Sequence, residues 1–261
     1  MVSMVDTVDY MYCVVPSSFD LGTGVTGIEE TVVRLVTLGD VAALVNALDG
    51  SSYTPEIIGE RAGDIEWLKP RAIAHDRVVT WASDRAPTIP MPMWTLFADD
   101  SGMLAAMHER YDTLCANLAT LRDAREYTVR IFADPAGVAS ALATLSPLFG
   151  ELEQSIQDVG PGQAYLLKRK VEEARKKEIR TVVKQVADET YEALARCSVD
   201  ATCDQLPKEG NAILNASFLV ANRGYDDFRL GLTDLMIRYQ PAGFKFDFTG
   251  PWPAYHFVRE H

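Results

Sequence analysis

The segment GPWPAYHFV, Gly250 to Val258, lies almost at the end of the chain and combines two prolines with three aromatic rings. Proline fixes its own φ and biases the preceding residue toward extended geometry, so Pro251 and Pro253 hold Trp252 extended and exclude a helix. A stiff aromatic strand loses little conformational entropy when it is fixed, and it has large rings to bury. The pattern therefore predicts a clamp, either against the protein's own fold or against a partner.

We favour the first of these alternatives, although tryptophan is common both as a core anchor and as an interface hot spot. The rings of Trp252, Tyr255 and Phe257 are then expected to lie against the protein's own fold and to pin the last strand of a second domain. If the strip is core, Trp252→Ala lowers the free energy of unfolding by about 3 to 5 kcal/mol. In the other alternative, part of the strip or a sheet edge beside it faces a partner.

The charge balance limits the classes of partner. The chain has 261 residues, with 37 acidic against 25 basic side chains and a net charge of −12. This charge opposes binding to nucleic acid and to anionic membrane surfaces. The longest uncharged run in the middle of the chain, Pro135 to Gly150, is interrupted by polar residues and a proline, and it falls short of the roughly 20 apolar residues of a bilayer span. We expect a soluble protein that binds neither nucleic acid nor membrane.

The ends and the cysteines indicate a cytosolic protein. The amino-terminal stretch MVSMVDTVDY carries two aspartates and no basic residue before an apolar run, so it does not resemble a secretion signal. Four scattered cysteines are too few for a disulfide framework in a chain of this size, and we expect them to be reduced thiols. The length favours two domains.

The first domain is predicted to cover residues 1–122 and to mix strands with helices. The run YMYCVV from Tyr10 is typical of a central strand. Apolar runs on either side of Gly39 and Asp40 indicate a hairpin, although the spacing in VAALVNAL also fits a helix that Asp40 could cap. Helical periodicity then runs from Thr54 until Pro87. The proline-rich run PTIPMPMWTLF indicates an extended edge strand or a connector. Another helix is expected over 101–122.

The second domain is predicted to cover residues 123–261. The run YTVRIF alternates apolar with polar side chains as a strand with one wet face does. Helical material to about Asp158, a long helix to about Arg196, the strand AILNASFLVA, a helix over Tyr225 to Tyr239 and the strand FKFDF complete this half. Helices over a mainly antiparallel sheet bury these faces, so the fold class is α+β in both domains.

Several of these stretches together resemble the gas vesicle protein F/L family (GvpF/GvpL), accessory proteins of gas-filled protein shells. The likeness spans nearly the whole chain and rests on YCVVP, GDVAALV, EWLKPRAIAHDRVV, GPGQAYLLKRK, LNASFLV and TGPWPAYHFV. The resemblance implies two α+β domains, the second a modified ferredoxin-like unit. It also implies a role in assembling the shell and no catalytic activity.

One stretch departs from the family's pattern. After its first long helix the family usually has a Leu-Pro-x-Arg-Phe-Gly-Thr type sequence, whereas this chain reads IPMPMWT from Ile89 to Thr95. The arginine and the glycine are both replaced. This departure bears on the choice of partner more than on the fold.

Few residues point to catalysis or to a bound cofactor. The glycines of GPGQAYL could present backbone donors to a phosphate, but no lysine follows at Walker spacing. His75, His108, His256 and His261 are far apart and form no helical zinc pair, and His75 is expected to be a core or interface histidine. We expect no catalytic residue, no metal and no cofactor.

The basic run of the long helix, from Lys168 to Lys184, is the one basic patch that the sequence indicates on an acidic protein. Such runs are usually solvated faces with i, i+4 pairs, and the alternative is a partner-docking surface. Candidate partner contacts on this helix are Lys168, Arg169, Arg175 and Lys176.

The first hypothesis is a non-enzymatic assembly factor or minor vesicle component that binds the main shell protein, GvpA in the family, and possibly other gas vesicle accessory proteins. It would act in the cytoplasm before assembly and then at the gas vesicle. The alternatives are a small-molecule-binding or enzymatic ferredoxin-like protein, because fold alone does not fix function, and a purely structural brick of the shell.

Overall fold

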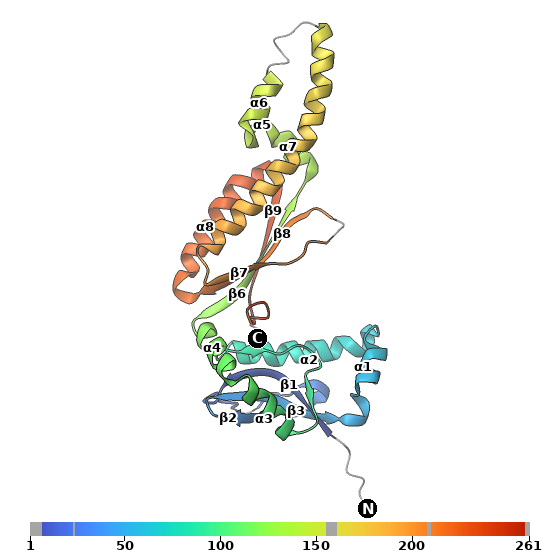
Figure 1. The fold of residues 1–261 in the computed structure, drawn as a ribbon, viewed down its shortest axis with the longest axis vertical. Helices are drawn as coiled ribbons and strands as arrows, with labels where there is room; N and C mark the ends of the chain where they lie inside the picture. The colour runs from blue at the N-terminus through green and yellow to red at the C-terminus, as the bar shows by residue number, and fades with distance from the viewer. Residues whose placement is uncertain (1–6, 23, 155–160, 208–209, 259–261) are drawn as a thin grey trace, which may run out of the picture. The chain divides into compact units, whose positions relative to one another are not determined.

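The computed structural model describes residues 7–22, 24–154, 161–207 and 210–258, and for 161–170 it describes the backbone alone. These residues form two compact units (Figure 1). The described parts of Met1–Arg125 and Trp252–His261 make up the first unit, and Glu126–Pro251 makes up the second. We expected the last residues to stay in the second domain, but the chain beyond Pro251 groups with the first unit.

The first unit is built on a sheet in the order β2-β3-β1-β4, with β5 also paired to β1. Its strands are β1 (Thr7–Pro16), β2 (Arg34–Leu38), β3 (Val41–Asp49), β4 (Ile89–Pro90) and β5 (Leu96–Phe97). The predicted hairpin is confirmed: Leu38 lies opposite Val41, and Gly39 turns the chain at a φ of 56°. The helical alternative for VAALVNAL is therefore wrong, and the central position of β1 explains why every residue of YMYCVV is buried.

Helices pack on this sheet, and there are two short 3-10 turns: η1 (Ile28–Glu30) lies between β1 and β2, and η2 (Gly50–Ser52) leads from β3 to the first helix. The helices are α1 (Pro55–Arg61), α2 (Ile65–Ser83), α3 (Asp100–Glu109) and α4 (Tyr111–Leu121). The side chains of Thr54, Asp64 and Asp99 accept backbone hydrogen bonds at the starts of α1, α2 and α3. The single helix expected over 101–122 is wrong, because Arg110 leaves helical geometry at φ −112° and ψ 14° and separates α3 from α4.

The second unit follows the order β-α-β-β-α-β, with extra helices in its first crossover. Its elements are β6 (Ala124–Ala133), α5 (Pro135–Leu145), α6 (Pro147–Gln154), α7 (Pro161–Ala195), β7 (Asp200–Cys203), β8 (Ala212–Ala221), η3 (Asn222–Gly224), α8 (Tyr225–Tyr239), η4 (Gln240–Ala242) and β9 (Phe244–Trp252). The sheet order is β7-β8-β6-β9. This connectivity and strand order are those of a ferredoxin-like unit, as the resemblance implied.

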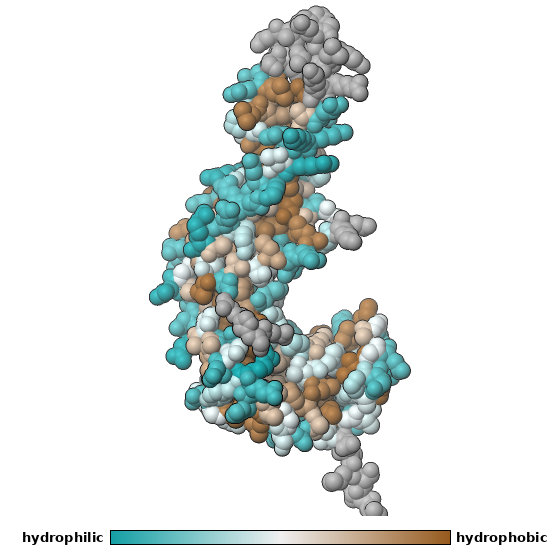
Figure 2. All heavy atoms as spheres, in the orientation of Figure 1, coloured by the Kyte–Doolittle hydropathy of each residue, from teal (hydrophilic) through white to brown (hydrophobic). Residues whose placement is uncertain are grey.

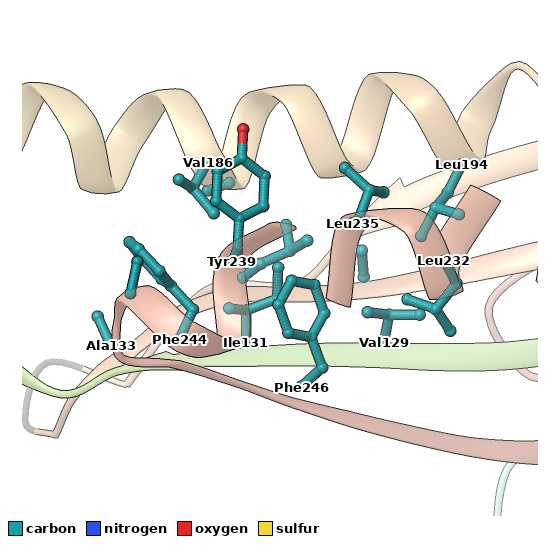
Figure 3. Close-up of a cluster of buried hydrophobic side chains, with 14 of the residues drawn as sticks. Val129, Ile131, Ala133, Val186, Leu194, Leu232, Leu235, Tyr239, Phe244 and Phe246 are labelled. Atoms are coloured by element: carbon teal, nitrogen blue, oxygen red, sulfur yellow. The ribbon is translucent and has the colours of Figure 1, made fainter. Parts of the chain in front are cut away.

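The core of the second unit lies between this sheet and the two long helices α7 and α8 (Figure 3). Its buried side chains come from every layer: Val129 and Ile131 from β6, Val186 and Leu194 from α7, Leu232, Leu235 and Tyr239 from α8, and Phe244 and Phe246 from β9. Hydrophilic side chains cover much of α7 in the face shown in Figure 2. The apolar stripe of each helix therefore faces the sheet and its polar stripe faces solvent.

Candidate functional site

The closing strip turns soon after β9 ends. The Tyr255 N–H donates to the carbonyl of Pro253 at 2.8 Å, and the Phe257 N–H donates to the carbonyl of Ala254 at 3.3 Å. Pro253 and Ala254 are buried. The strip is thus anchored by its two small residues, and the rings beside them are left nearer the surface.

The predicted core role of the aromatic rings is wrong for Trp252 and Tyr255. Trp252 is 46% exposed and Tyr255 is 41% exposed, while Phe257 is half-buried. The cause is the turn, because it buries the small side chains of the strip in place of the rings. Large rings exposed on a fixed backbone are typical of surfaces that contact other proteins.

Gly250 is the residue of β9 with which the closing strip begins. Its φ is 125°, in the left-handed region that favours glycine. A Cβ at this position would lie 2.9 Å from the carbonyl oxygen of Glu126. The glycine of the TGPWPAY motif is therefore required by both conformation and close approach.

A cleft of about 500 Å³ lies beside the strip in the first unit. It is lined by Ile89, Pro90, Met91, Pro92, Arg110, Leu114, Tyr255 and Val258. Two of these are prolines with no N–H, and the Arg110 Nε is buried without a hydrogen-bond acceptor in the described part of the chain. The cleft can hold apolar side chains of a partner and offers one guanidinium at its wall.

Trp94 occupies the place where the family's motif usually has glycine, and it keeps the backbone that glycine would favour, with φ 69°. Its indole stacks on that of Trp67, with ring centroids 5.1 Å apart and an interplanar angle of 20°. The Arg71 guanidinium lies 4.5 Å from the Trp67 ring centroid and donates from Nε to the Tyr53 hydroxyl at 2.8 Å. The strained residue is thus held by a half-buried aromatic cluster, defined by Tyr53, Trp67, Arg71 and Trp94.

A hydrogen-bond chain joins this cluster to the interior. The Trp94 N–H donates to the Tyr10 hydroxyl at 3.4 Å, and that hydroxyl lies 2.8 Å from the Nδ1 of His75. Burial lowers the pKa of His75 to about 4, although the Met91 backbone acts in the opposite direction. His75 is therefore neutral at neutral pH, in the core position expected for it, and it fixes the segment that carries Trp94.

The basic residues of α7 lie in the second unit, apart in the chain from the strip. Arg175 is engaged internally: it pairs with Glu153 of α6, lies 3.9 Å from Glu172, and stands 5.7 Å from the Phe149 ring centroid. Lys176 is exposed. The side chains of Lys168 and Arg169 lie outside the described residues, and so does Gly160 of the GPG motif.

Other classes of site find little support in the described residues. No group of three or more histidine, cysteine or acidic side chains gathers there in a way that could hold a metal ion. None of the helices described has the length and apolarity needed to cross a bilayer.

Two features of this region could not be recognised as a site from the sequence. The aromatic cluster has one local signal, Trp67 and Arg71 at i, i+4 on a helix, but its partners Tyr53 and Trp94 come from distant segments. Arg110 gave no signal, because its position at the cleft depends on a helix break without proline or glycine.

Each of the two units is a sheet packed with helices, so the fold belongs to the α+β class. The model of the family described as gas vesicle synthesis protein GvpL/GvpF matches residues 9–259, and the chain belongs to this family.

Similar proteins support this assignment. Gas vesicle protein L of Streptomyces sp. (strain CB03234) is 27% identical over 97% of this chain and 93% of its own length. Gas vesicle protein L1 of Halobacterium salinarum is 28% identical over 95% of this chain and 89% of its own length. The crystal structure of GvpF from Anabaena sp. PCC7120 matches with a TM-score of 0.73 at 12% identity, over 98% of this chain and 99% of that one. The crystal structure of GvpF from Microcystis aeruginosa matches with a TM-score of 0.66 at 13% identity, over 97% of this chain and 99% of that one. These structures share the fold.

Proposed function

We propose that this protein is a gas vesicle assembly factor or minor vesicle component that binds the main shell protein, GvpA in the family, and assists its delivery or nucleation. The observation that carries the proposal is the family match over residues 9–259. The exposed ring of Tyr255, which lines the apolar cleft, supports it, because such rings are frequent anchors of protein contacts. The protein acts in the cytoplasm before assembly and then at the vesicle.

The chemistry of the cleft suits an aggregation-prone partner. A small apolar shell subunit exposes apolar side chains and strand edges before it is assembled. Pro90 and Pro92 offer no N–H on the segment that lines the cleft, so this edge is a poor template for further strands. The cleft can therefore cover apolar side chains of the subunit without extending a sheet from it.

The net charge of −12 has a complementary role. Complexes that each carry this charge repel one another over distances of about 10 Å at 0.1 M salt. The protein can thus hold an apolar subunit at the cleft and keep neighbouring complexes apart. Release would follow when the growing shell offers the subunit a larger apolar surface.

Co-purification with variants of the strip tests this proposal. The chain and the main shell protein are expressed together, and the chain carries an affinity tag. We expect capture of the shell protein by the wild-type chain and loss of capture with Tyr255→Ser. The matched control is Ile237→Ser, which removes an exposed aliphatic side chain of α8, 68% exposed in the second unit, and should leave capture unchanged. Capture that is equal for all three chains would place the contact elsewhere and refute the assignment of the cleft.

A further inference from the structure

The outer edge of β9 has no neighbouring strand in the part of the chain that the structure describes. The sheet runs β7-β8-β6-β9, so β6 covers one side of β9 and leaves the other as a sheet edge. Edge strands present unpaired N–H and C=O groups and pair readily with another strand. In the strand itself, the proline that could block such pairing, Pro251, lies near the carboxyl end, and the first residues from Phe244 are free of proline.

The side chains of β9 alternate strictly between the two faces of the sheet. Phe244 and Phe246 are 2% and 8% exposed and project into the core (Figure 3). Lys245 is exposed and Asp247 is half-buried, on the opposite face. The proline-free part of this edge strand therefore carries one cation, Lys245, and one anion, Asp247, and has no net charge of its own.

These charges make the strand complementary to itself. When two copies of β9 pair antiparallel about Phe246, Lys245 of each copy lies opposite Asp247 of the other. Directly opposite residues have their Cβ atoms about 5 Å apart, and opposite charges there stabilise the pair. The same register places Phe244 opposite Phe248, so the apolar face continues from one copy to the next.

The neighbouring registers are unfavourable for the same reason. A shift that keeps the phenylalanines on the core face moves the strand by two residues, because side chains alternate with a period of two. One such shift places Lys245 opposite Lys245, and the other places Asp247 opposite Asp247. Parallel, in-register pairing also aligns like charges. Only the antiparallel register about Phe246 pairs both charges favourably.

We propose that a second copy of this chain pairs with β9 along this edge, antiparallel and centred on Phe246. The contact is isologous, so it closes with two copies and does not propagate into a fibre. It joins the two four-stranded sheets into one continuous sheet. The proposal concerns the second unit, so it stands or falls separately from the cleft and the shell protein.

The charge of the whole chain opposes this dimer, because both copies carry −12. That repulsion acts over distances that salt screens beyond about 8 Å at 0.15 M ionic strength, whereas the two Lys245–Asp247 pairs lie in direct contact. A contact built on one strand pair is small, so we expect a dimer that dissociates in the micromolar range.

Sedimentation velocity of the full-length chain over about 1 to 100 µM at 0.15 M salt measures the dimer. Lys245→Asp and Asp247→Lys each turn both contacts into like-charge pairs, and each should weaken the dimer by roughly tenfold or more. Because the two substitutions change the net charge in opposite directions, an effect of overall charge would move them oppositely. Lys245 and Asp247 lie on the face of the sheet away from the core, and circular dichroism checks that each variant is folded.

Mixing the two variants gives the sharper test. An equimolar mixture of Lys245→Asp with Asp247→Lys restores opposite charges in both pairs, so the mixture should dimerise although neither variant does alone. The double variant that exchanges the two charges should dimerise as the wild type does. A wild-type chain that is monomeric throughout the range overturns the proposal. A dimer that survives both single substitutions, or a mixture that stays monomeric, overturns it equally.

Discussion

The strained backbone at Trp94 leads to a prediction about the order of two variants. An L-residue in the left-handed region costs about 1 to 2 kcal/mol, and glycine pays no such cost. Trp94→Ala and Trp94→Gly both remove the stack on Trp67, but only the glycine variant relieves the backbone at φ 69°. We therefore expect Trp94→Gly to be more stable than Trp94→Ala by about 1 kcal/mol. This order is the reverse of the usual one, in which glycine is less stable than alanine by roughly 0.5 to 1 kcal/mol.

Both variants should be less stable than the wild type. The half-buried indole contributes its stacking, worth about 0.5 to 1.5 kcal/mol, in addition to the apolar area that it buries. The sum for Trp94→Ala is roughly 2 to 4 kcal/mol, somewhat below the range for a fully buried tryptophan. Relief of the backbone lowers the cost of Trp94→Gly to roughly 1 to 3 kcal/mol.

Urea denaturation followed by far-ultraviolet circular dichroism measures these free energies of unfolding. The control pair is Ile73→Ala and Ile73→Gly, at a 56% exposed position inside α2. There the alanine variant should be the more stable by about 1 kcal/mol. If Trp94→Ala proves as stable as Trp94→Gly or more so, the backbone at this position is not strained, and the reasoning fails.

Three further predictions concern other parts of the chain. Burial lowers the pKa of His75 from 6.5 to about 4, so the unfolded state binds the proton first as the pH falls. The wild type should therefore lose about 3 kcal/mol of stability between pH 6.5 and 4 relative to His75→Gln. Unfolding curves of both proteins at several pH values check this, and parallel pH profiles would contradict it. Gly250→Ala should lower the free energy of unfolding by about 2 kcal/mol or more, because the added Cβ would lie 2.9 Å from a carbonyl oxygen. The control is Gly63→Ala, where the Cβ would have no atom within 4 Å, and it should be neutral or slightly stabilising. Equal melting temperatures for the two variants would refute the steric argument. Arg175→Gln should lower the free energy of unfolding by about 1 kcal/mol and Lys176→Gln should hardly change it, because of these two side chains only Arg175 joins α6 to α7. Urea denaturation compares the two variants. An equal loss of stability would show that the basic run acts as one patch.

Local patterns in the sequence predicted many of the elements. The pair Gly39 and Asp40 identified a hairpin because a tight turn needs a residue that accepts positive φ. AILNASFLVA, residues 212–221, was recognised as a strand with its bounds correct, and the helical period over Tyr225 to Tyr239 matched α8. These segments have long, regular patterns in which one face is buried.

Elements without such a pattern were missed. The strand β7 is only four residues long and exposed at both ends, so DATC carries no alternation of buried and exposed apolar residues. The break at Arg110 lies inside a continuous helical period and contains neither proline nor glycine. Pro70 shows the converse, because this proline lies inside α2 and the helix continues through it.

The sequence singled out the closing strip as a candidate contact, which stays a prediction, but it did not give the geometry of the strip. The composition of GPWPAYHFV marked the strip as a clamp, and the resemblance supplied the family. The sequence could not show that the strip turns after Trp252, because the turn depends on which small residues find room in the first unit. The positive φ of Trp94 was equally hidden, since tryptophan is a residue that local rules exclude from that conformation.

We propose above all that this protein binds the main shell subunit and keeps it from aggregating before assembly. Dilution of the denatured main shell protein into buffer, with light scattering recorded at increasing amounts of the purified chain, tests that claim most directly. If the chain binds the subunit, scattering should fall to near zero at roughly equimolar chain, and the two proteins should elute together as one peak in gel filtration. Shell protein that precipitates to the same extent with and without the chain, at every salt concentration, would contradict it.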